Sequence, residues 1–146
     1  MDVVTTVRDL LQIKGSAVWA VGPDTPLKDA LALMADKDVG ALLVMEDCKA
    51  VGIFSERDYA RRGVLMGRGV DATMEEMMTS PVLAIDPERT MEDVQEIMTE
   101  RHFRHLPVME NGKVIGLISI GDVVKSIIDE QANQISGLEN YITGRR

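Results

Sequence analysis

A tandem repeat is the sequence feature that most constrains the fold of this chain. The stretch Gly52-Ile53-Phe54-Ser55-Glu56-Arg57-Asp58 has a second copy, Gly116-Leu117-Ile118-Ser119-Ile120-Gly121-Asp122, with glycine, serine and aspartate at the same spacing. The copies are 64 positions apart, and this offset holds without a gap from residues 18–62 to residues 82–126. Identical pairs along it include Val18/Val82, Pro23/Pro87, Asp29/Asp93, Leu42/Leu106 and Val44/Val108. The sequence therefore predicts two copies of one folding unit.

The length of the repeat predicts that the two copies depend on each other. Each copy has about 60 residues, and a unit of that size buries too little surface to be comfortably stable alone. The 146-residue chain is therefore expected to form one pseudo-symmetric body in which the repeats share a core. We predict a first unit with an N-terminal helix over residues 1–68, a second with a linker helix over 69–134, and a C-terminal tail over 135–146.

The hydrophobic pattern of each copy predicts the order strand, helix, strand, strand, helix. The strands are expected at residues 18–21, 40–45 and 50–54, and again at 82–85, 103–109 and 113–118. Helices are expected from residue 27 and residue 56, and at 91–98 and 122–133, with additional short helices at 4–13 and 72–78. Thr90 is a suitable N-cap, and Asn111-Gly112 is a strong hairpin signal. The fold class predicted is α+β, with α/β-like units whose first strand pairs in parallel through a helical crossover.

The tail has apolar residues at helical spacing, namely Ile135, Leu138, Tyr141 and Ile142. Two interpretations remain open at this point, because an amphipathic stripe does not identify its partner. The tail either covers an interface in a dimer or packs back on its own chain.

Composition excludes several classes of function. A net charge of -8 opposes nucleic-acid binding, which depends on Lys and Arg, and 3% aromatic residues provide few stacking platforms. No stretch is apolar enough to span a membrane, and the N-terminus lacks the features of a signal peptide, so we expect a cytoplasmic protein. The single cysteine, Cys48, excludes an internal disulfide and a cysteine-based zinc cluster.

The Gly-x-x-Ser-x-x-Asp motif has two interpretations. Serine before a helix with an acid three residues later forms a capping box, and the glycine permits close packing. The same geometry also suits a nucleotide, because a helix N-terminus with free backbone N–H groups binds phosphate and a carboxylate can accept hydrogen bonds from both hydroxyls of a ribose. Carboxylate and phosphate repel each other, so they are expected at different ends of one ligand.

These features together resemble a known family. The duplicated unit, the run Arg104-His105-Leu106-Pro107-Val108 and the two Gly-x-x-Ser-x-x-Asp motifs are similar to a pair of cystathionine β-synthase (CBS) domains over nearly the whole chain. The chain looks like a free-standing prokaryotic CBS-pair protein, or Bateman module, with no catalytic domain attached. This resemblance implies two tandem β-α-β-β-α repeats in a pseudo-two-fold pair, with clefts that bind AMP, ADP, ATP, NAD(H) or S-adenosylmethionine.

The resemblance also implies which residues form two nucleotide sites. The motif aspartates would hold ribose hydroxyls, the motif serines would face phosphate, and Ile53 and Leu117 would touch the nucleoside. Site 1 is expected to contain Ile53, Ser55, Arg57, Asp58, Thr79, Val82, Arg104 and His105. Site 2 is expected to contain Ser16, Val18, Trp19, Gly40, Ala41, Arg104, Leu117, Ser119 and Asp122.

The two sites are not equivalent in charge. Arg57 and the pair Arg104 and His105 favour site 1 for a phosphate-bearing ligand, whereas site 2 is expected to be less cationic. Arg61 and Arg62 are predicted to lie on a solvated helix face. His102 and His105 straddle a boundary between helix and strand without a third ligand, so no metal site is predicted.

The sequence favours a binding module over an enzyme, because no nucleophile with a base and no catalytic metal set can be assembled. We predict a homodimeric regulatory module that requires no cofactor, senses an adenosyl nucleotide and signals to a partner protein by a conformational change. Two alternatives are a ligand-independent dimeric adaptor and an enzyme that processes the bound nucleotide. The sequence identifies neither the ligand nor the regulated partner.

Overall fold

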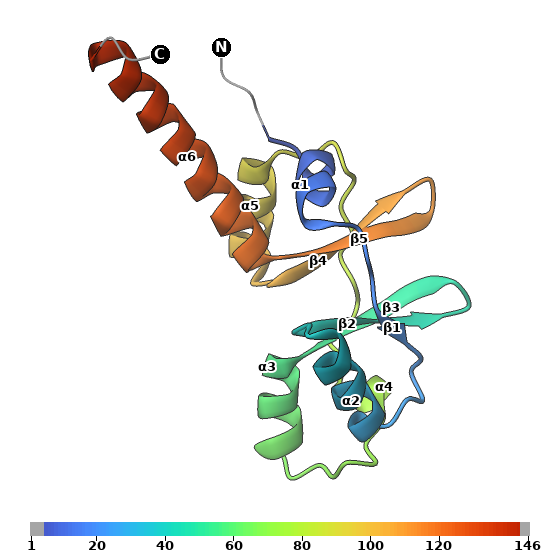
Figure 1. Cartoon of the computed structure of the whole chain (residues 1–146). Coiled ribbons are helices and arrows are strands. Elements are labelled where there is room, and N and C mark those ends of the chain that lie inside the picture. Colours follow the sequence, from blue (N-terminus) through green and yellow to red (C-terminus); the bar gives the residue numbers. More distant parts are fainter. Residues whose placement is uncertain (1–4, 144–146) are drawn as a thin grey trace.

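The chain folds into two similar halves, each built around a small sheet (Figure 1). The computed structural model describes residues 5–143, with side chains described through residue 132 and at Ile135. The first half contains β1 (Ala20–Val21), α2 (Leu27–Lys37), β2 (Ala41–Glu46), β3 (Lys49–Ser55), α3 (Glu56–Asp58) and the π-helical η1 (Tyr59–Val64). The second half contains α5 (Met91–Arg101), β4 (His105–Glu110), β5 (Lys113–Ser119) and α6 (Ile120–Thr143). Two further helices, α1 (Val7–Lys14) and α4 (Met74–Met77), precede the halves in sequence. This architecture confirms the predicted α+β class and the repeat.

The two hairpins have the same register. In the first sheet β1 pairs in parallel with β2, and β2 pairs antiparallel with β3; in the second sheet β4 pairs antiparallel with β5. Both hairpins shift register at equivalent positions, after Val44 and after Val108. Asn111 and Gly112 have φ values of 54° and 76°, the left-handed conformation that a two-residue hairpin turn requires. The predicted hairpin turn is therefore confirmed.

The strand predicted at residues 82–85 is wrong. Only Ile85 pairs with β4, through a single parallel bridge to Val108. Six residues earlier, Thr79 pairs with Ile53 of the first sheet. The segment between these two contacts crosses from one sheet to the other, so it has too little length left to form a strand in the second sheet.

Each half has its own hydrophobic cluster, so the predicted single shared core is replaced by two. Val7, Leu10 and Leu11 of α1 pack in the second half, against residues from α5, β4, β5 and α6. Met74 and Met77 of α4 pack in the first half, against α2, β2 and β3. The helices that precede the halves therefore cross over: each belongs to a core other than the one that follows it in sequence. The predicted unit boundaries after residues 68 and 134 remain predictions. Met74 and Met77 follow the first of these boundaries but pack in the core of the first half.

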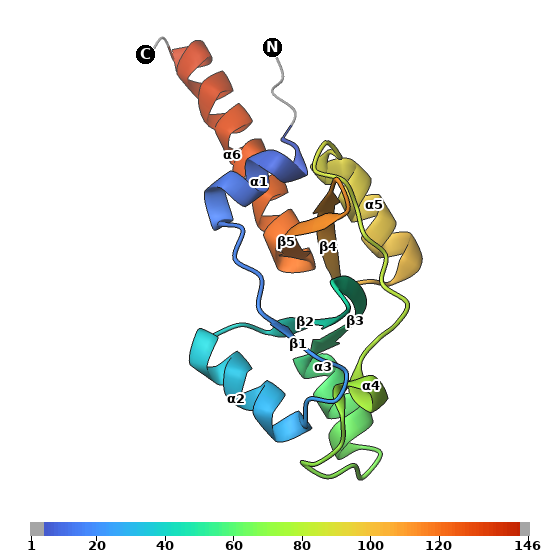
Figure 2. The same ribbon diagram turned by 90° about the vertical axis from the view of Figure 1, so that its right-hand side faces the viewer.

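The sheets lie in the middle of the molecule and the helices at its two ends, as the two views in Figures 1 and 2 agree. Leu42 and Val44 of β2 point into the first core, while Leu43 alternates with them and is also buried. In β4, Leu106 and Val108 point into the second core, and Pro107 between them is buried. Both faces of β2 and β4 are thus covered, and the halves meet through their sheets.

The helices differ from prediction mainly at their ends. The helix predicted at residues 4–13 is observed at Val7–Lys14, with Thr6 and Asp9 forming a capping box; Val4 lies outside the described residues. The helix predicted at residues 72–78 is only the single turn of α4. The last helix and the predicted tail are one helix, α6, because no residue between them interrupts the backbone hydrogen bonding. The side chains of Leu138, Tyr141 and Ile142 lie outside the description. Within the described chain, no helix is both long and apolar enough to cross a bilayer.

Candidate functional site

Cavity 1 is a space of about 240 Å³ between the two halves. Every residue predicted for site 1 lines it except Val82, which lies on the segment that crosses between the sheets. Its walls come from β3, α3 and η1 of the first half, from Thr79, and from the end of α5 and the start of β4. The complete lining is Ile53, Ser55, Arg57, Asp58, Arg61, Arg62, Thr79, His102, Phe103, Arg104 and His105.

Ser55 and Asp58 form the predicted capping box at the start of α3. The backbone N–H of Ser55 donates to Asp58 Oδ2 at 3.0 Å, and the N–H of Asp58 donates to Ser55 Oγ at 3.3 Å. Thr79 Oγ1 donates to the other carboxylate oxygen, Asp58 Oδ1, at 2.9 Å. The carboxylate is therefore held in one orientation at the wall of cavity 1, with lone pairs still available to accept ribose hydroxyls.

The start of α3 offers fewer free donors to a phosphate than the sequence suggested. The capping box occupies the N–H groups of Ser55 and Asp58, and the N–H of Glu56 donates to the carbonyl oxygen of Gly40 at 3.1 Å. The second half repeats this last bond, with Ile120 N–H donating to Arg104 O at 2.8 Å. Phosphate donors in cavity 1 must therefore come mainly from side chains.

Arginines supply those donors. Four arginines line cavity 1 against one carboxylate, that of Asp58. Arg62 donates to the backbone carbonyls of Met77 and Met78, so it closes the C-terminal end of α4. The ion pairs in the described part of the chain include neither Arg57, Arg61 nor Arg104.

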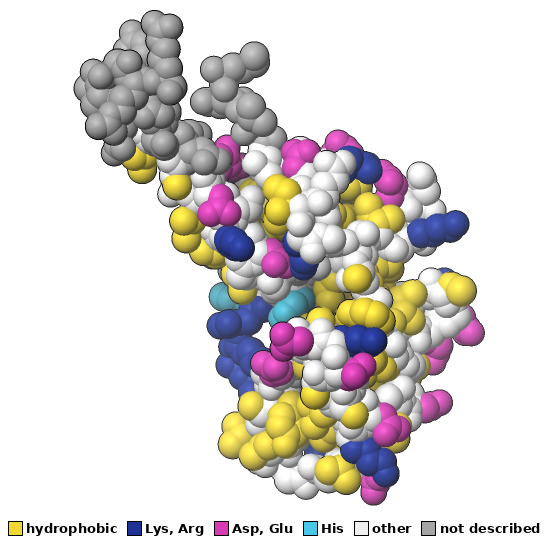
Figure 3. Space-filling model, viewed as in Figure 1, with side chains coloured by type: hydrophobic (Ala, Val, Ile, Leu, Met, Phe, Trp, Pro, Cys, Tyr) yellow, Lys and Arg dark blue, Asp and Glu magenta, His cyan; other side chains and the backbone are white. Residues whose placement is uncertain are grey.

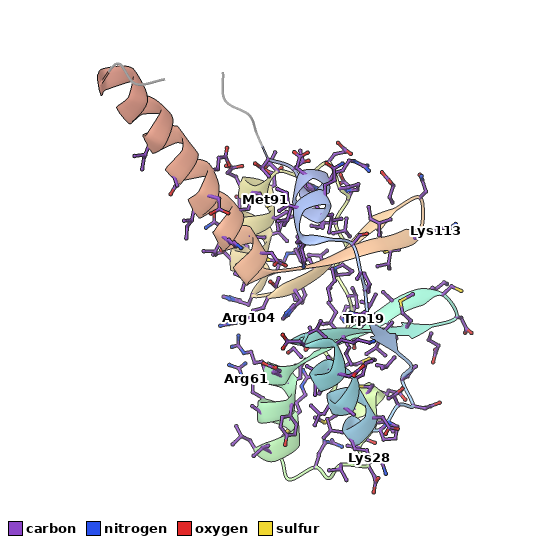
Figure 4. The ribbon with its side chains drawn as sticks, viewed as in Figure 1. Trp19, Lys28, Arg61, Met91, Arg104 and Lys113 are labelled. Carbon is purple, nitrogen blue, oxygen red and sulfur yellow. The ribbon has the colours of Figure 1, made fainter. Side chains whose placement is uncertain are left out.

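The three remaining arginines meet from both halves. Figure 4 shows Arg61 and Arg104 projecting toward the same opening, and Figure 3 shows the basic and histidine side chains gathered there. Desolvation and the neighbouring guanidinium groups of Arg104 and Arg61 lower the pKa of Arg57, so these cations repel one another. Arg61 is exposed, as predicted for a solvated helix face, but Arg61 and Arg62 also line cavity 1, which the prediction did not include.

His102, which was not placed in site 1, lines cavity 1 together with its neighbour Phe103. His102 has a left-handed backbone, with φ of 59°, at the end of α5. The position of His102 two residues before the predicted Arg104 was the available signal. Among the described residues, no group of three or more His, Cys, Asp or Glu side chains lies close enough together to hold a metal ion.

Cavity 2 lies between the halves and has a volume of about 290 Å³. It gathers the residues predicted for site 2 except Ser16, which is exposed outside it, and Arg104, which lines only cavity 1. Its complete lining is Lys14, Ala17, Val18, Trp19, Asp38, Val39, Gly40, Ala41, His105, Leu117, Ile118, Ser119 and Asp122. Trp19 is 36% exposed, and Lys37 Nζ lies 4.6 Å from its ring centroid, so one face of the indole already has a cation against it.

Lys14 is one of the residues of cavity 2 that the sequence did not predict. Its ammonium donates to Asp122 Oδ2 at 2.6 Å and to the carbonyl oxygen of Leu117 at 2.8 Å. Burial opposes ionisation of Asp122, but the Lys14 ammonium and the N–H of Ser119 outweigh it and hold the pKa of this carboxyl below its ordinary value. The Asp122 carboxylate of cavity 2 is therefore neutralised from within the chain.

His105 lines both cavities. Burial lowers the pKa of its imidazole, although the carboxylates of Asp122 and Asp58 act in the opposite direction. His105 therefore lies between the two cavities. Because its pKa is lowered, its imidazole is expected to be neutral at pH 7.

Known proteins resemble this chain over most of its length. The family described as CBS domain matches residues 7–64 and 74–129. The mitochondrial CBS domain-containing protein CBSX3 of Arabidopsis thaliana is 33% identical over 96% of this chain and 73% of its own length. A candidate signal-transduction protein with CBS domains from Burkholderia ambifaria is 44% identical, with a TM-score of 0.81 over 87% of this chain and 96% of its own. CBSX2, solved in complex with AMP, is 29% identical, with a TM-score of 0.67 over 86% of this chain and 98% of its own.

Proposed function

Because the chain belongs to the CBS domain family, which matches both of its repeats, we propose that it is a regulatory module that senses an adenosyl nucleotide in cavity 1. One observation carries the proposal: cavity 1 joins Ser55 and Asp58 of the first half to Arg104 and His105 of the second. A ligand there contacts both halves at once. It can therefore favour one relative orientation of the halves, provided that its affinity differs between orientations.

The chemistry of cavity 1 suits a nucleoside phosphate. Asp58 is the acceptor for ribose hydroxyls, and the arginines are donors for phosphate. The AMP complex of CBSX2, a relative of the same fold, supports an adenine nucleotide over other anions.

A homodimer is the second part of the proposal. Val124, Ile128 and Ile135 form an exposed apolar stripe on α6, and Ile128 and Ile135 are 57% and 58% exposed. Val64, Leu65 and Met66 form a second exposed apolar group at the end of η1, on the same side of the molecule (Figure 3). Val64 and Ile128 are 64 positions apart, the offset of the repeat. Two exposed apolar groups on one side, which share this one equivalent position, fit a contact with a second copy of the chain.

The adaptor alternative has one observation in its favour. Both motif serines and aspartates complete capping hydrogen bonds without any ligand. The motifs would then be retained for helix stability alone. The absence of enzymatic activity and a cytoplasmic location remain predictions; incubation of AMP, ATP or NAD with the purified protein, followed by chromatography, tests the former.

Thermal unfolding against AMP, ADP, ATP, NAD, NADH and S-adenosylmethionine tests the proposed function. A ligand at about a hundred times its Kd adds roughly 2.7 kcal/mol of stability, which is several degrees for a chain of this size. We expect at least one nucleotide to raise the unfolding midpoint, and Asp58→Ala to abolish that increase.

Asp9→Ala is the matched control, because Asp9 closes the same kind of capping box on α1 but lies outside both cavities. It should lower the baseline stability as Asp58→Ala does and keep the full nucleotide response. If the nucleotide-free protein responds to no ligand, or if Asp58→Ala responds as the unmodified protein does, the adaptor replaces the sensor.

A further inference from the structure

Cavity 1 has an excess of positive charge that the protein itself does not balance. Arg57, Arg61 and Arg104 line it, and none of them takes part in the ion pairs of the described residues. The only carboxylate in the lining, Asp58, is held by Ser55 and Thr79. This arrangement stands out in a chain whose net charge is -8. Clustered cations without counterions favour an anionic ligand with more than one charge to share among them.

The lining of cavity 1 is ordered from inside to outside. Ile53, Ser55, Asp58 and Thr79 are half-buried, as is His105, whereas Arg57, Arg61 and Arg104 are exposed at the mouth. The ribose acceptor therefore lies deeper than the phosphate donors. A nucleotide bound in this direction directs its phosphates outward, so the volume of the cavity does not limit their number.

The arginines also replace the donors that the start of α3 lacks. The backbone N–H groups of Ser55, Glu56 and Asp58 are already hydrogen-bonded within the protein. A single phosphate next to the ribose can reach few donors there. Each guanidinium presents several N–H donors in a fixed plane that matches phosphate oxygens, so further phosphates gain contacts that the first cannot make.

From these observations we propose that cavity 1 selects adenosyl ligands with two or more phosphates. Asp58 binds the ribose, while Arg57 and Arg61 from the first half and Arg104 from the second bind the outer phosphates. This inference rests on the proposed function and specifies its ligand class. Nucleoside monophosphates should therefore bind more weakly than di- and triphosphates. S-adenosylmethionine should also bind weakly, because its sulfonium carries a positive charge.

The experiment is a calorimetric titration of the nucleotide-free protein with ATP, ADP, AMP and S-adenosylmethionine in the presence of EDTA. The expected affinities decrease in the order ATP, ADP, AMP, with a factor of about five to ten for each phosphate removed. Arg61→Gln and Arg104→Gln should each weaken ATP about five- to tenfold and AMP less than about threefold. Arg101→Gln, an exposed arginine of α5 outside the cavity, is the control and should change neither affinity.

Inorganic tripolyphosphate separates recognition of the nucleoside from recognition of phosphate alone. In the unmodified protein ATP should bind more tightly than tripolyphosphate, and Asp58→Ala should remove that difference. Equal affinity for AMP and ATP would overturn the selection by phosphate number and leave the nucleotide sensor intact. If tripolyphosphate binds as tightly as ATP, cavity 1 does not recognise the adenosyl group. If none of these compounds binds, both the inference and the proposed function are wrong.

Discussion

Lys14 Nζ lies 2.6 Å from Asp122 Oδ2 and 2.8 Å from the carbonyl oxygen of Leu117. Thr79 makes both corresponding contacts in the other cavity, with its hydroxyl on Asp58 and its backbone N–H on the carbonyl oxygen of Ile53. In cavity 2 the Lys14 ammonium of α1 thus makes the two contacts that the hydroxyl and the backbone N–H of Thr79 make in cavity 1. The two motif aspartates have corresponding hydrogen bonds, but among the ion pairs of the described residues only Asp122 is paired with a cation.

The Lys14–Asp122 pair should contribute to stability in a pH-dependent way. The folded state lowers the pKa of Asp122 below its ordinary 3.8, so the stabilisation is present above that value and is lost as pH falls through the folded pKa. The two side chains are 31% and 26% exposed, which is between a surface pair and a buried one. Lys14→Met should therefore lower the free energy of unfolding by about 1 kcal/mol at pH 7. Urea unfolding at pH 7 and pH 3 measures the difference, which should shrink at the lower pH.

Lys28→Met is the control for this pair, because Lys28 and Asp71 are 3.5 Å apart and mostly exposed. It should change the free energy of unfolding by less than about 0.5 kcal/mol. An equal loss in both variants at pH 7 would show that the Lys14–Asp122 pair has no special role in stability.

His105 should make the protein less stable as the solution becomes mildly acidic. Its pKa is lowered in the folded state by burial, so below the ordinary value of 6.5 the unfolded chain binds a proton that the folded chain resists. Stability should consequently fall as pH decreases from about 7 toward the folded pKa, and His105→Gln should flatten that dependence. Urea unfolding between pH 7.5 and 5.5 tests this.

The motif glycines should be intolerant of a methyl group. A Cβ at Gly52 would overlap the side chain of Met78, and one at Gly116 would overlap Leu11. Gly52→Ala and Gly116→Ala should each lower the free energy of unfolding by about 1–3 kcal/mol, because the connecting helices must shift. Gly69→Ala is the control, since nothing lies within 4 Å of its added Cβ, and it should stay within about 0.5 kcal/mol. Thermal unfolding measures the effect. Unchanged unfolding midpoints for both Gly52→Ala and Gly116→Ala would contradict the close packing.

The stripe on α6 should control the oligomeric state. Ile128→Glu places a charge in the middle of the exposed apolar stripe, so it should convert the proposed homodimer to a monomer without changing the circular dichroism spectrum. Sedimentation equilibrium measures the mass. Lys125→Glu, a change of charge on an exposed neighbour, should leave the dimer intact. A monomeric parent protein, or a dimeric Ile128→Glu variant, would remove this stripe as the interface.

The repeat predicted the fold well because a fixed offset transfers every local signal from one copy to the other. It also brought Asp58 and Arg104 into one predicted site, through the family resemblance, and cavity 1 contains both. Periodicity could not indicate Lys14, because its contacts depend on α1 packing in the half that is distant in sequence. The position of Arg61 at cavity 1 was missed although Arg61 follows Arg57 by four residues, a spacing that places both side chains on one face of a helix.

Because α1 packs in the second half and α4 in the first half, the two cores can be completed at different times during translation. All residues of the first core lie within one continuous segment that ends with α4, so this half can complete its packing while the second repeat is still being translated. The second core is split: Val7, Leu10 and Leu11 leave the ribosome first, but their partners Ile118 and Val123 leave more than a hundred residues later. The first half is in this sense inserted into the second. Until the last repeat emerges, the apolar face of α1 has no native surface to cover it, and that interval is where a nascent chain of this design is most exposed to misfolding.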